Sequence, residues 1–268
     1  MQTYENKHAF VVCAYKESGY LEQCIQSLLR QTVTSKILIS TSTPNDLIEN
    51  VAAKYKIPLR IHQGEADIAQ DWNFAYSQAS ADYVTLAHQD DIYEPDYVVR
   101  MISAMESSQK PLIFCSNYYE IRNGKKVTGN RLLKIKRLLI APLMIKQWQH
   151  FTLVRRWCLA FGNSICCPSV TFAARNLPSE IFSVQFRSDV DWQTWERLSK
   201  MPGSFCYDSA MLVGHRIHDG SETSKVIGDG QRTGEDLEMF RKFWCMPLAK
   251  LLTKYYASSE KSNKGTNT

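Results

Sequence analysis

The sequence contains no apolar run of about 18 residues, the length that a membrane-spanning helix needs. Its first residues also lack a basic segment followed by roughly 7–15 apolar residues, so no export signal is visible. Both absences predict a cytoplasmic protein. The eight cysteines form no CxxC pair, and the adjacent Cys166 and Cys167 have no second pair that would complete a zinc site. We therefore expect reduced thiols that serve as small core residues.

Two glycine-rich patterns that hold phosphates are missing as well, because neither a Rossmann dinucleotide turn nor a P-loop is present. If the protein binds a nucleotide, we expect a divalent metal held by carboxylates as the substitute. Mn2+ and Mg2+ take oxygen ligands and bridge phosphates. The net charge of +5 is small for 268 residues, and we expect no nucleic-acid partner from it.

Short apolar segments alternate with helical patterns through the first 120 residues. The apolar segments have the length and composition of buried strands and span residues 9–15, 36–41, 58–63, 82–89 and 111–121. Between them, apolar residues recur at the spacing of a helix with one buried face, as in Leu21, Cys24, Ile25 and Leu28. This alternation predicts an α/β fold with a mainly parallel sheet and helices on both faces.

Three polar clusters follow the first, second and fourth of these strands. They read AYKES, STSTPND and HQDD, and they should converge, because ligands of such sheets bind beyond the carboxyl ends of the strands. The last cluster contains Asp90 and Asp91, whose mutual repulsion requires a compensating positive charge. Two interpretations of the pair remain open. It is either an exposed turn that caps the helix opening near Pro95, or a site for a metal bound with a phosphorylated ligand.

The segment from Arg122 to Arg156 holds ten Lys or Arg residues and no Asp or Glu. These bases are mixed with Leu, Ile, Met and Trp. One interpretation is a pair of surface helices packed on the sheet. The other is peripheral contact with an anionic membrane, at the inner face of the plasma membrane, where each base near the surface contributes about 1 kcal/mol.

Five stretches, in their order and spacing, resemble family 2 glycosyltransferases of the GT-A fold and of bacterial cell-surface polysaccharide type. In chain order they are CAYKES, Gln31-Thr32, DIAQDWNFAYSQASADYVTLAHQDD, SDVDWQTWERLSK and HRIHDGSETS. The resemblance extends from about His8 to Trp244. It implies a nucleotide-sugar-binding half at 1–120 and an acceptor-binding and catalytic half at 121–257. The polar composition of 258–268 separately predicts a flexible tail.

The resemblance also implies a role for each matched position. Asp191 would be the general base that takes the proton of the acceptor hydroxyl, with Asp189 as the second candidate. The nucleotide-binding residues would be Ala14, Tyr15, Glu17, Thr41, Ser42, Asp46, Trp72 and Asp90. The metal ligands would come from Asp90, Asp91, His88 and His218, and the diphosphate ligands from Arg216, His218 and Ser221. The expected donor is a UDP-sugar, the acceptor is a glycan or lipid-linked glycan, and the reaction inverts the anomeric configuration.

The sequence departs from the family pattern at three points. Lys16 stands where Asn is usual. STSTPND replaces the usual Asp-Asp-Gly-Ser-Thr, so the carboxylate that often reads the uracil edge is missing or displaced to Asp46. His88 replaces the first acid of the metal motif, so the metal site would need another ligand, such as His218.

The sequence leaves two other functions open. A sugar-phosphate nucleotidyltransferase would need a glycine- and arginine-rich loop, and CAYKESGY offers one glycine and no arginine. A non-enzymatic basic module at a membrane surface would leave the acids unexplained. Several of these residues also have purely structural interpretations. Asp189 or Asp191 can be a helix cap, His215 and His218 can be ordinary loop residues, and Trp72 or Trp192 can be part of the core.

Overall fold

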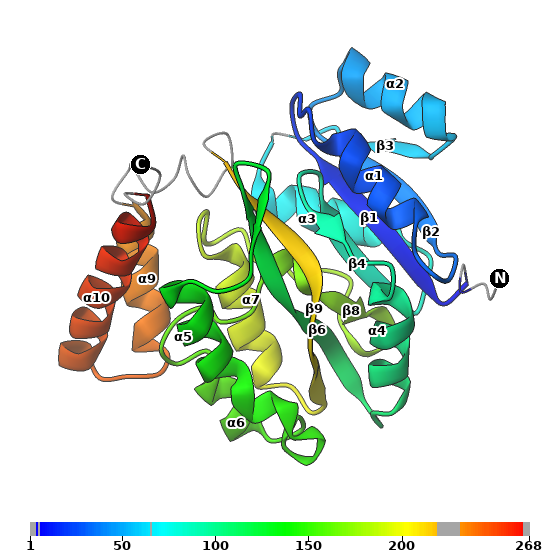
Figure 1. The fold of residues 1–268 in the computed structure, drawn as a ribbon. Coiled ribbons are helices and arrows are strands. Elements are labelled where there is room, and N and C mark those ends of the chain that lie inside the picture. Colours follow the sequence, from blue (N-terminus) through cyan, green and yellow to red (C-terminus); the bar gives the residue numbers. More distant parts are fainter. Residues whose placement is uncertain (1–3, 5, 65, 219–230, 265–268) are drawn as a thin grey trace.

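Figure 1 shows the computed structural model, which describes residues 4, 6–64, 66–218 and 231–264. Four parallel strands form the first part of its sheet, in the order β3-β2-β1-β4. They are β1 (His8–Ala14), β2 (Lys36–Thr41), β3 (Leu59–Ile61) and β4 (Tyr83–His88). β2, β3 and β4 lie within predicted strand segments, and β1 begins one residue before its segment. β1 and β4 are buried along almost their whole length, as apolar strands at the centre of a parallel sheet are, whereas β3 at the edge is largely exposed.

The rest of the sheet is mixed in direction. β8 (Thr171–Ala173) lies between β4 and β6 (Pro111–Arg122) and is antiparallel to both. β9 (Ser204–Ile217) runs parallel to β6, while β5 (Ile92–Tyr93) pairs antiparallel with β9 and β7 (Lys125–Val127) antiparallel with β6. Because β8 opposes both β4 and β6, the long strands β6 and β9 run in the same direction as the first four, and only the short strands β5, β7 and β8 are opposed. The expectation of a mainly parallel sheet is therefore confirmed. One sheet contains strands from both of the expected halves.

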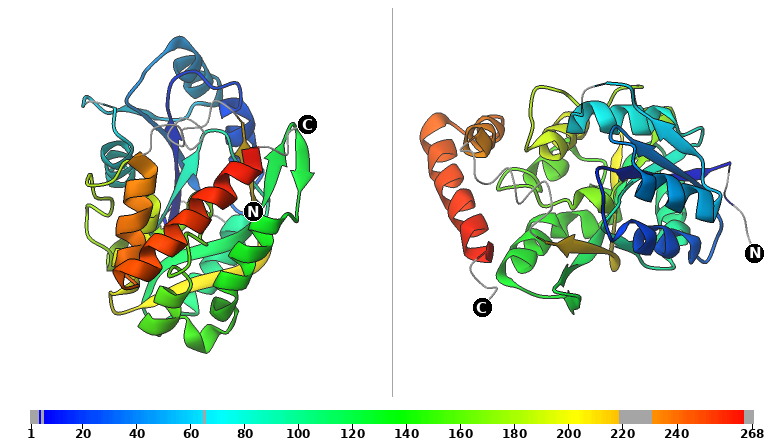
Figure 2. Two further views of the ribbon diagram at one scale, coloured as in Figure 1. Left: turned by 90° about the vertical axis from the view of Figure 1, so that its left-hand side faces the viewer. Right: turned by 90° about the horizontal axis from the view of Figure 1, so that it is seen from above.

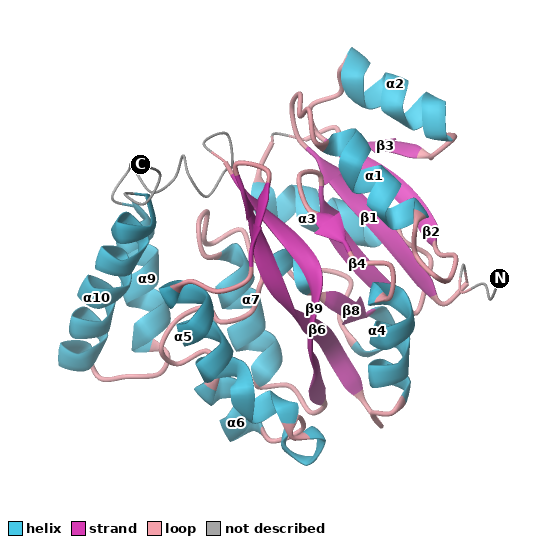
Figure 3. Cartoon of the chain, in the orientation of Figure 1, coloured by secondary structure: helices cyan, strands magenta, loops and turns pink. Residues whose placement is uncertain are grey.

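Two hydrophobic cores cover the two faces of the sheet, as the alternation of side chains along β1 requires. Phe10 and Val12 pack with α1 (Leu21–Leu29), α2 (Asp46–Tyr55) and α4 (Tyr97–Glu106). Val11 points to the other face, toward α3 (Ile68–Ser77) and α7 (Val190–Ser199). The predicted arrangement of helices on both faces is confirmed, and Figure 3 shows these helices against the strands.

The second half adds helices around the far part of the sheet. They are α5 (Arg131–Ile140), α6 (Thr152–Trp157), α9 (Gln231–Arg241) and α10 (Met246–Lys264), with the 3-10 turns η1 (Ala141–Met144), η2 (Lys146–Trp148), η3 (Cys167–Ser169) and η4 (Ala174–Asn176). Figure 2 shows α9 and α10 at the opposite end of the molecule from α1 and α2. Trp192 of α7 packs against Phe240 and Tyr256, which ties α9 and α10 to the core.

Within the described residues, no helix is both long and apolar enough to cross a membrane. All eight cysteines are free thiols, and most are buried. Cys245 is exposed, so the expectation that the cysteines are core residues is wrong for this one.

Candidate active site

A cleft of about 760 Å³ opens at the carboxyl ends of β1, β2 and β4. The strand-end residues Tyr15, Ser42 and Asp90 line it together, so the three polar clusters meet in one place. Asp191, at the start of α7, lines the same cleft from the second half of the chain. The fold thus brings the three strand-end clusters and the acidic motif around Asp191 into a single cavity.

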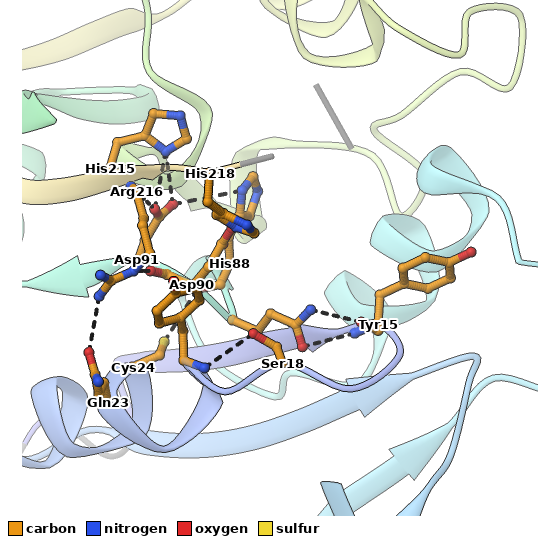
Figure 4. Close-up of polar contacts among 12 residues, drawn as sticks. Tyr15, Ser18, Gln23, Cys24, His88, Asp90, Asp91, His215, Arg216 and His218 are labelled. Carbon is orange, nitrogen blue, oxygen red and sulfur yellow. Dashed lines mark hydrogen bonds and ion pairs between the residues drawn. The ribbon is translucent and has the colours of Figure 1, made fainter. Parts of the chain in front are cut away.

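Asp90 faces a histidine across this cleft. Its Oδ2 lies 2.9 Å from Nε2 of His218, which follows directly after β9 (Figure 4). Both side chains are about one-fifth to one-quarter exposed, at 19% and 25%. Within the described residues, no group of three or more His, Cys, Asp or Glu is arranged to hold a metal ion. A cation here would therefore need further ligands from its substrate or from water.

Asp91, by contrast, is wholly buried and does not line the cleft. Its Oδ1 accepts a hydrogen bond from the backbone N–H of Arg216 at 2.8 Å and lies 3.1 Å from Nδ1 of His215. The expectation that Asp91 is a metal ligand is corrected by this placement, because its carboxylate is bound within the protein. A histidine lies beside each acid of the pair, His215 at Asp91 and His218 at Asp90.

The buried Asp91 and the partly exposed His215 shift each other's pKa. Burial alone would raise the pKa of Asp91, but the charge and hydrogen bond of His215 outweigh it and leave the pKa below the ordinary value. Burial would likewise lower the pKa of His215, and the charge of Asp91 reverses the shift and raises it. His215 lies on strand β9, so the loop interpretation is wrong for it.

Arg216 lies behind the cleft. Its Nε donates to the backbone carbonyl of Asp90 at 2.8 Å, its Nη2 donates to Gln23, and its guanidinium lies 4.1 Å from the ring centroid of Tyr20. It is 7% exposed and is not part of the cleft lining. The expected diphosphate ligand is therefore a support for the backbone that carries Asp90. Ser221, the other expected ligand, lies outside the described residues.

His88 occupies the position of the missing acid. Its ring stacks on Trp72 with centroids 5.3 Å apart, and both residues line the cleft. Its Nε2 is buried and has no hydrogen-bond partner among the described residues. The stacked pair forms an aromatic wall of the cleft, so Trp72 is not purely a core residue, whereas Trp192 is fully buried.

The part of the cleft next to the end of β2 contains an acid, Asp71, that was not among the expected site residues. Asp71 of α3 accepts a hydrogen bond from the Ser42 hydroxyl at 2.7 Å, and its other oxygen lies 2.7 Å from Nδ1 of His62. Asp46 is exposed in the first turn of α2 and does not line the cleft. Asp71, and not the expected Asp46, is therefore the carboxylate that lines this end of the cleft. In the sequence, Asp71 is only one acid in a predicted helix, and nothing distinguishes it there from an acid on the protein surface.

The remaining expected nucleotide residues, Ala14, Glu17 and Thr41, also line the cleft. The backbone of Tyr15 is held by Gln89, which accepts from its N–H at 3.1 Å and donates to its carbonyl at 2.8 Å. Lys16 has a φ of 54°, in the left-handed region that Asn tolerates better than Lys.

Asp191 is partly buried and oriented by two donors. Nδ2 of Asn163 donates to its Oδ2 at 2.7 Å, and the backbone N–H of Trp192 donates to its Oδ1 at 2.7 Å. Burial raises the pKa of Asp191, although the hydrogen bonds and the charges of Lys136 and Arg232 partly offset this. A carboxylate with a raised pKa that faces a cleft is suited to accept a proton.

Asp189 is the N-terminal boundary residue of α7, but its side chain makes no capping hydrogen bond. It is only 3% exposed, and burial, followed by the nearby Asp236, raises its pKa well above the ordinary value. Glu235 of α9 accepts hydrogen bonds from the backbone N–H groups of Arg187, Ser188 and Asp189 at 3.0, 2.7 and 3.1 Å. Glu235 thus caps α7 from a distant part of the chain, a role that no sequence pattern indicated.

The fold and the position of this cleft define a protein of the GT-A class, and solved structures share the architecture. S. aureus TarS 1–349 in complex with UDP-GlcNAc matches with a TM-score of 0.59 and 13% identity, over 88% of this chain and 71% of that one. The mannosyltransferase PcManGT from Pyrobaculum calidifontis, in complex with GDP-Man and Mn2+, matches with a TM-score of 0.57 and 12% identity, over 95% of this chain and 70% of that one. At these identities the likeness concerns the fold.

The family follows from the sequence itself. Residues 9–173 match the model of glycosyl transferase family 2, and the chain belongs to this family. The uncharacterized glycosyltransferase EpsJ of Bacillus subtilis (strain 168) is 25% identical over 147 residues, which are 53% of this chain and 42% of EpsJ. Glycosyltransferase GlyA of Streptococcus pneumoniae serotype 4 (strain ATCC BAA-334 / TIGR4) is 25% identical over 126 residues, 45% of this chain and 18% of GlyA. The matches thus span less than half the length of either relative.

Proposed function

We propose that the protein transfers a sugar from a nucleotide-diphosphate donor, a UDP-sugar, to a hydroxyl of a glycan or lipid-linked glycan acceptor. The observation that carries this proposal is the presence of two unlike acids in one cleft, Asp90 beside His218 and Asp191 at the start of α7. Membership of glycosyl transferase family 2 supports it, and so does the likeness in fold to a UDP-GlcNAc complex.

Asp90 and His218 are the residues that would hold a divalent metal. A carboxylate and an imidazole, both partly exposed in the cleft, form a donor set that suits Mn2+, so these residues fit the cation. The donor diphosphate and water would supply the remaining ligands, as in Mg2+ sites built on one or two carboxylates. When bound, the metal neutralises negative charge on the leaving nucleoside diphosphate.

Asp191 is the proposed general base. The acceptor oxygen attacks the anomeric carbon while its proton passes to the Asp191 carboxylate, and the bond from that carbon to the diphosphate oxygen breaks. Asn163 and the Trp192 N–H orient the carboxylate for this transfer. A single displacement of this kind inverts the anomeric configuration.

A metal-dependent binding assay tests the donor side directly. Titration calorimetry with UDP in Mn2+ should show binding that EDTA removes, and a ligand at 100 times its Kd should stabilise the fold by about 2.7 kcal/mol. Asp90→Asn should abolish this binding while the unfolding transition stays close to that of the wild type. The same titration with GDP identifies the base. Unchanged UDP affinity in the Asp90→Asn variant would refute the assignment.

A further inference from the structure

Exposed large apolar side chains gather in one part of the structure. Sixteen such side chains are exposed among the described residues, and half of them lie between residues 135 and 157. Leu153 is 84% exposed and Leu138 is 74% exposed, which are high values for leucine. The eight are Ile135, Leu138, Met144, Ile145, Trp148, Phe151, Leu153 and Trp157.

Six of these side chains lie on α5, η1, η2 and α6, and Ile145 and Phe151 lie between these elements. η1 packs against each of α5, η2 and α6. On α5, the exposed residues Arg131, Lys134, Ile135 and Leu138 follow the i, i+3, i+4, i+7 spacing of one helix face. Leu133 is buried on another side of the same helix. We call the exposed side chains of residues 131–157 the α5–α6 surface, and Figure 1 labels its two helices.

The charge of this surface has one sign, because residues 122–156 contain no Asp or Glu. Some of the ten bases serve the fold. Arg155 is buried and donates to the carbonyls of Met201 and Gly203, and Arg156 pairs with Glu196 at 2.5 Å. Arg131, Lys134 and Lys146 are exposed beside the apolar side chains.

We propose that the α5–α6 surface docks on an anionic lipid bilayer, with its apolar side chains at the headgroup boundary and its bases against the lipid charge. Charge complementarity selects this occupant, since a second copy of the chain would place bases opposite bases. The indole rings of Trp148 and Trp157 suit the membrane interface, where aromatic side chains are enriched.

Helix α5 also connects this surface to the cleft. Leu132 and Lys136, on another side of the helix from Leu138, line the cleft near Asp191. A lipid-linked acceptor held in the bilayer would then present its hydroxyl to the cleft along α5. This statement about the acceptor rests on the proposed function, whereas docking on the bilayer does not.

Sedimentation with vesicles tests the docking. The wild-type protein should co-sediment with vesicles of phosphatidylcholine and phosphatidylglycerol at low salt, and should not do so with vesicles of phosphatidylcholine alone. Lys134→Glu and Lys146→Glu should each weaken the partition at least fivefold, since the loss of one base near the surface already has about that effect. Leu138→Ser combined with Leu153→Ser should weaken it at least tenfold, because two exposed apolar side chains are removed.

Matched controls lie elsewhere on the surface. Lys36→Glu changes an exposed base, and Val184→Ser changes an apolar side chain that is 61% exposed, so neither should alter the partition. Equal loss in the controls, or no co-sedimentation of the wild type, overturns the proposal. The proposal is also overturned if the wild-type protein forms a dimer and the α5–α6 variants abolish that dimer. Nucleotide-sugar turnover in detergent-free buffer is measured separately, so that loss of docking and failure of the proposed activity are told apart.

Discussion

The carboxylate of Asp91 lies 3.1 Å from Nδ1 of His215, a residue 124 positions further along the chain. This contact joins the end of β4 to β9 beneath the cleft, and Asp91 is wholly buried in it. Its neighbour Asp90 is partly exposed and faces the cleft instead. Of these two adjacent acids, Asp91 is therefore bound within the fold, whereas Asp90 is accessible from the cleft.

Replacing each acid by alanine should change the stability of the protein to a different extent. We expect Asp91→Ala to lower the free energy of unfolding by about 1–3 kcal/mol, because it leaves the buried N–H of Arg216 without its acceptor and removes the partner of His215. Asp90→Ala should change it by less than about 1 kcal/mol. Urea unfolding at neutral pH measures both. Equal stability of the two variants would contradict the distinction.

Much of the structure of residues 1–120 could be predicted from the sequence, because its strands are apolar and its helices carry apolar residues at regular helical spacing. β9 could not, since Asp208 and Ser209 interrupt its apolar pattern and the strand pairs with β6 through irregular register. The roles of Asp90 and Asp91 were equally hidden, because adjacent residues of a turn point in different directions that the sequence does not specify. Asp71 reaches the cleft only through the placement of α3.

Asp191→Asn tests the proposed base. The change keeps the size of the side chain and removes its ability to accept the proton, so we expect kcat to fall by about 10²- to 10⁴-fold with donor Kd nearly unchanged. Asp189→Asn should cost far less, because Asp189 is 3% exposed and lies against Asp236. Steady-state turnover and donor calorimetry of both variants give the comparison. Collapse of turnover in the Asp189 variant alone would reverse the assignment.

The pH dependence of turnover should reflect the same group. Burial raises the pKa of Asp191, with Asn163, Lys136 and Arg232 acting against the shift. A base must be deprotonated, so kcat/KM should fall as the pH drops through this raised pKa, at a higher pH than an exposed aspartate would give. A pH–rate profile measures the acidic limb.

The same shift affects stability in the opposite direction. A carboxyl whose pKa is raised by folding stabilises the fold below its unfolded pKa, and this contribution is lost as the pH rises through the folded pKa. Asp191→Asn should therefore be more stable than the wild type at neutral pH, with the difference disappearing in acid. Thermal unfolding at the two pH values provides the test, and an identical Tm at neutral pH would argue against the raised pKa.

Asp71 should govern binding of the nucleoside. Its carboxylate lies in the cleft beside Ser42, where it can accept an N–H of the base. Loss of one charge-assisted hydrogen bond of about 1.5–3 kcal/mol predicts a roughly 10- to 100-fold weaker UDP affinity for Asp71→Asn. Asp46→Asn is the matched control, because Asp46 is exposed outside the cleft and should leave the affinity unchanged. Calorimetry that ranks the two variants the other way would restore Asp46 as the base reader.

Glu235 should position the catalytic end of α7 without touching substrate. Its carboxylate accepts the N–H groups of three consecutive residues, Arg187 to Asp189, two residues before the proposed base. Glu235→Ala leaves these donors without their acceptor and lets the start of α7 shift. Because a displacement of about 1 Å can cost on the order of 10²-fold in rate, we expect kcat to fall by about 10- to 100-fold with donor Kd unchanged. Glu238→Ala, an exposed change on the same helix, should have no such effect.

Added acetate should partly restore kcat in Glu235→Ala, because a free carboxylate can occupy the three N–H groups. A variant that loses stability but keeps its kcat would show that Glu235 only holds α9 to α7.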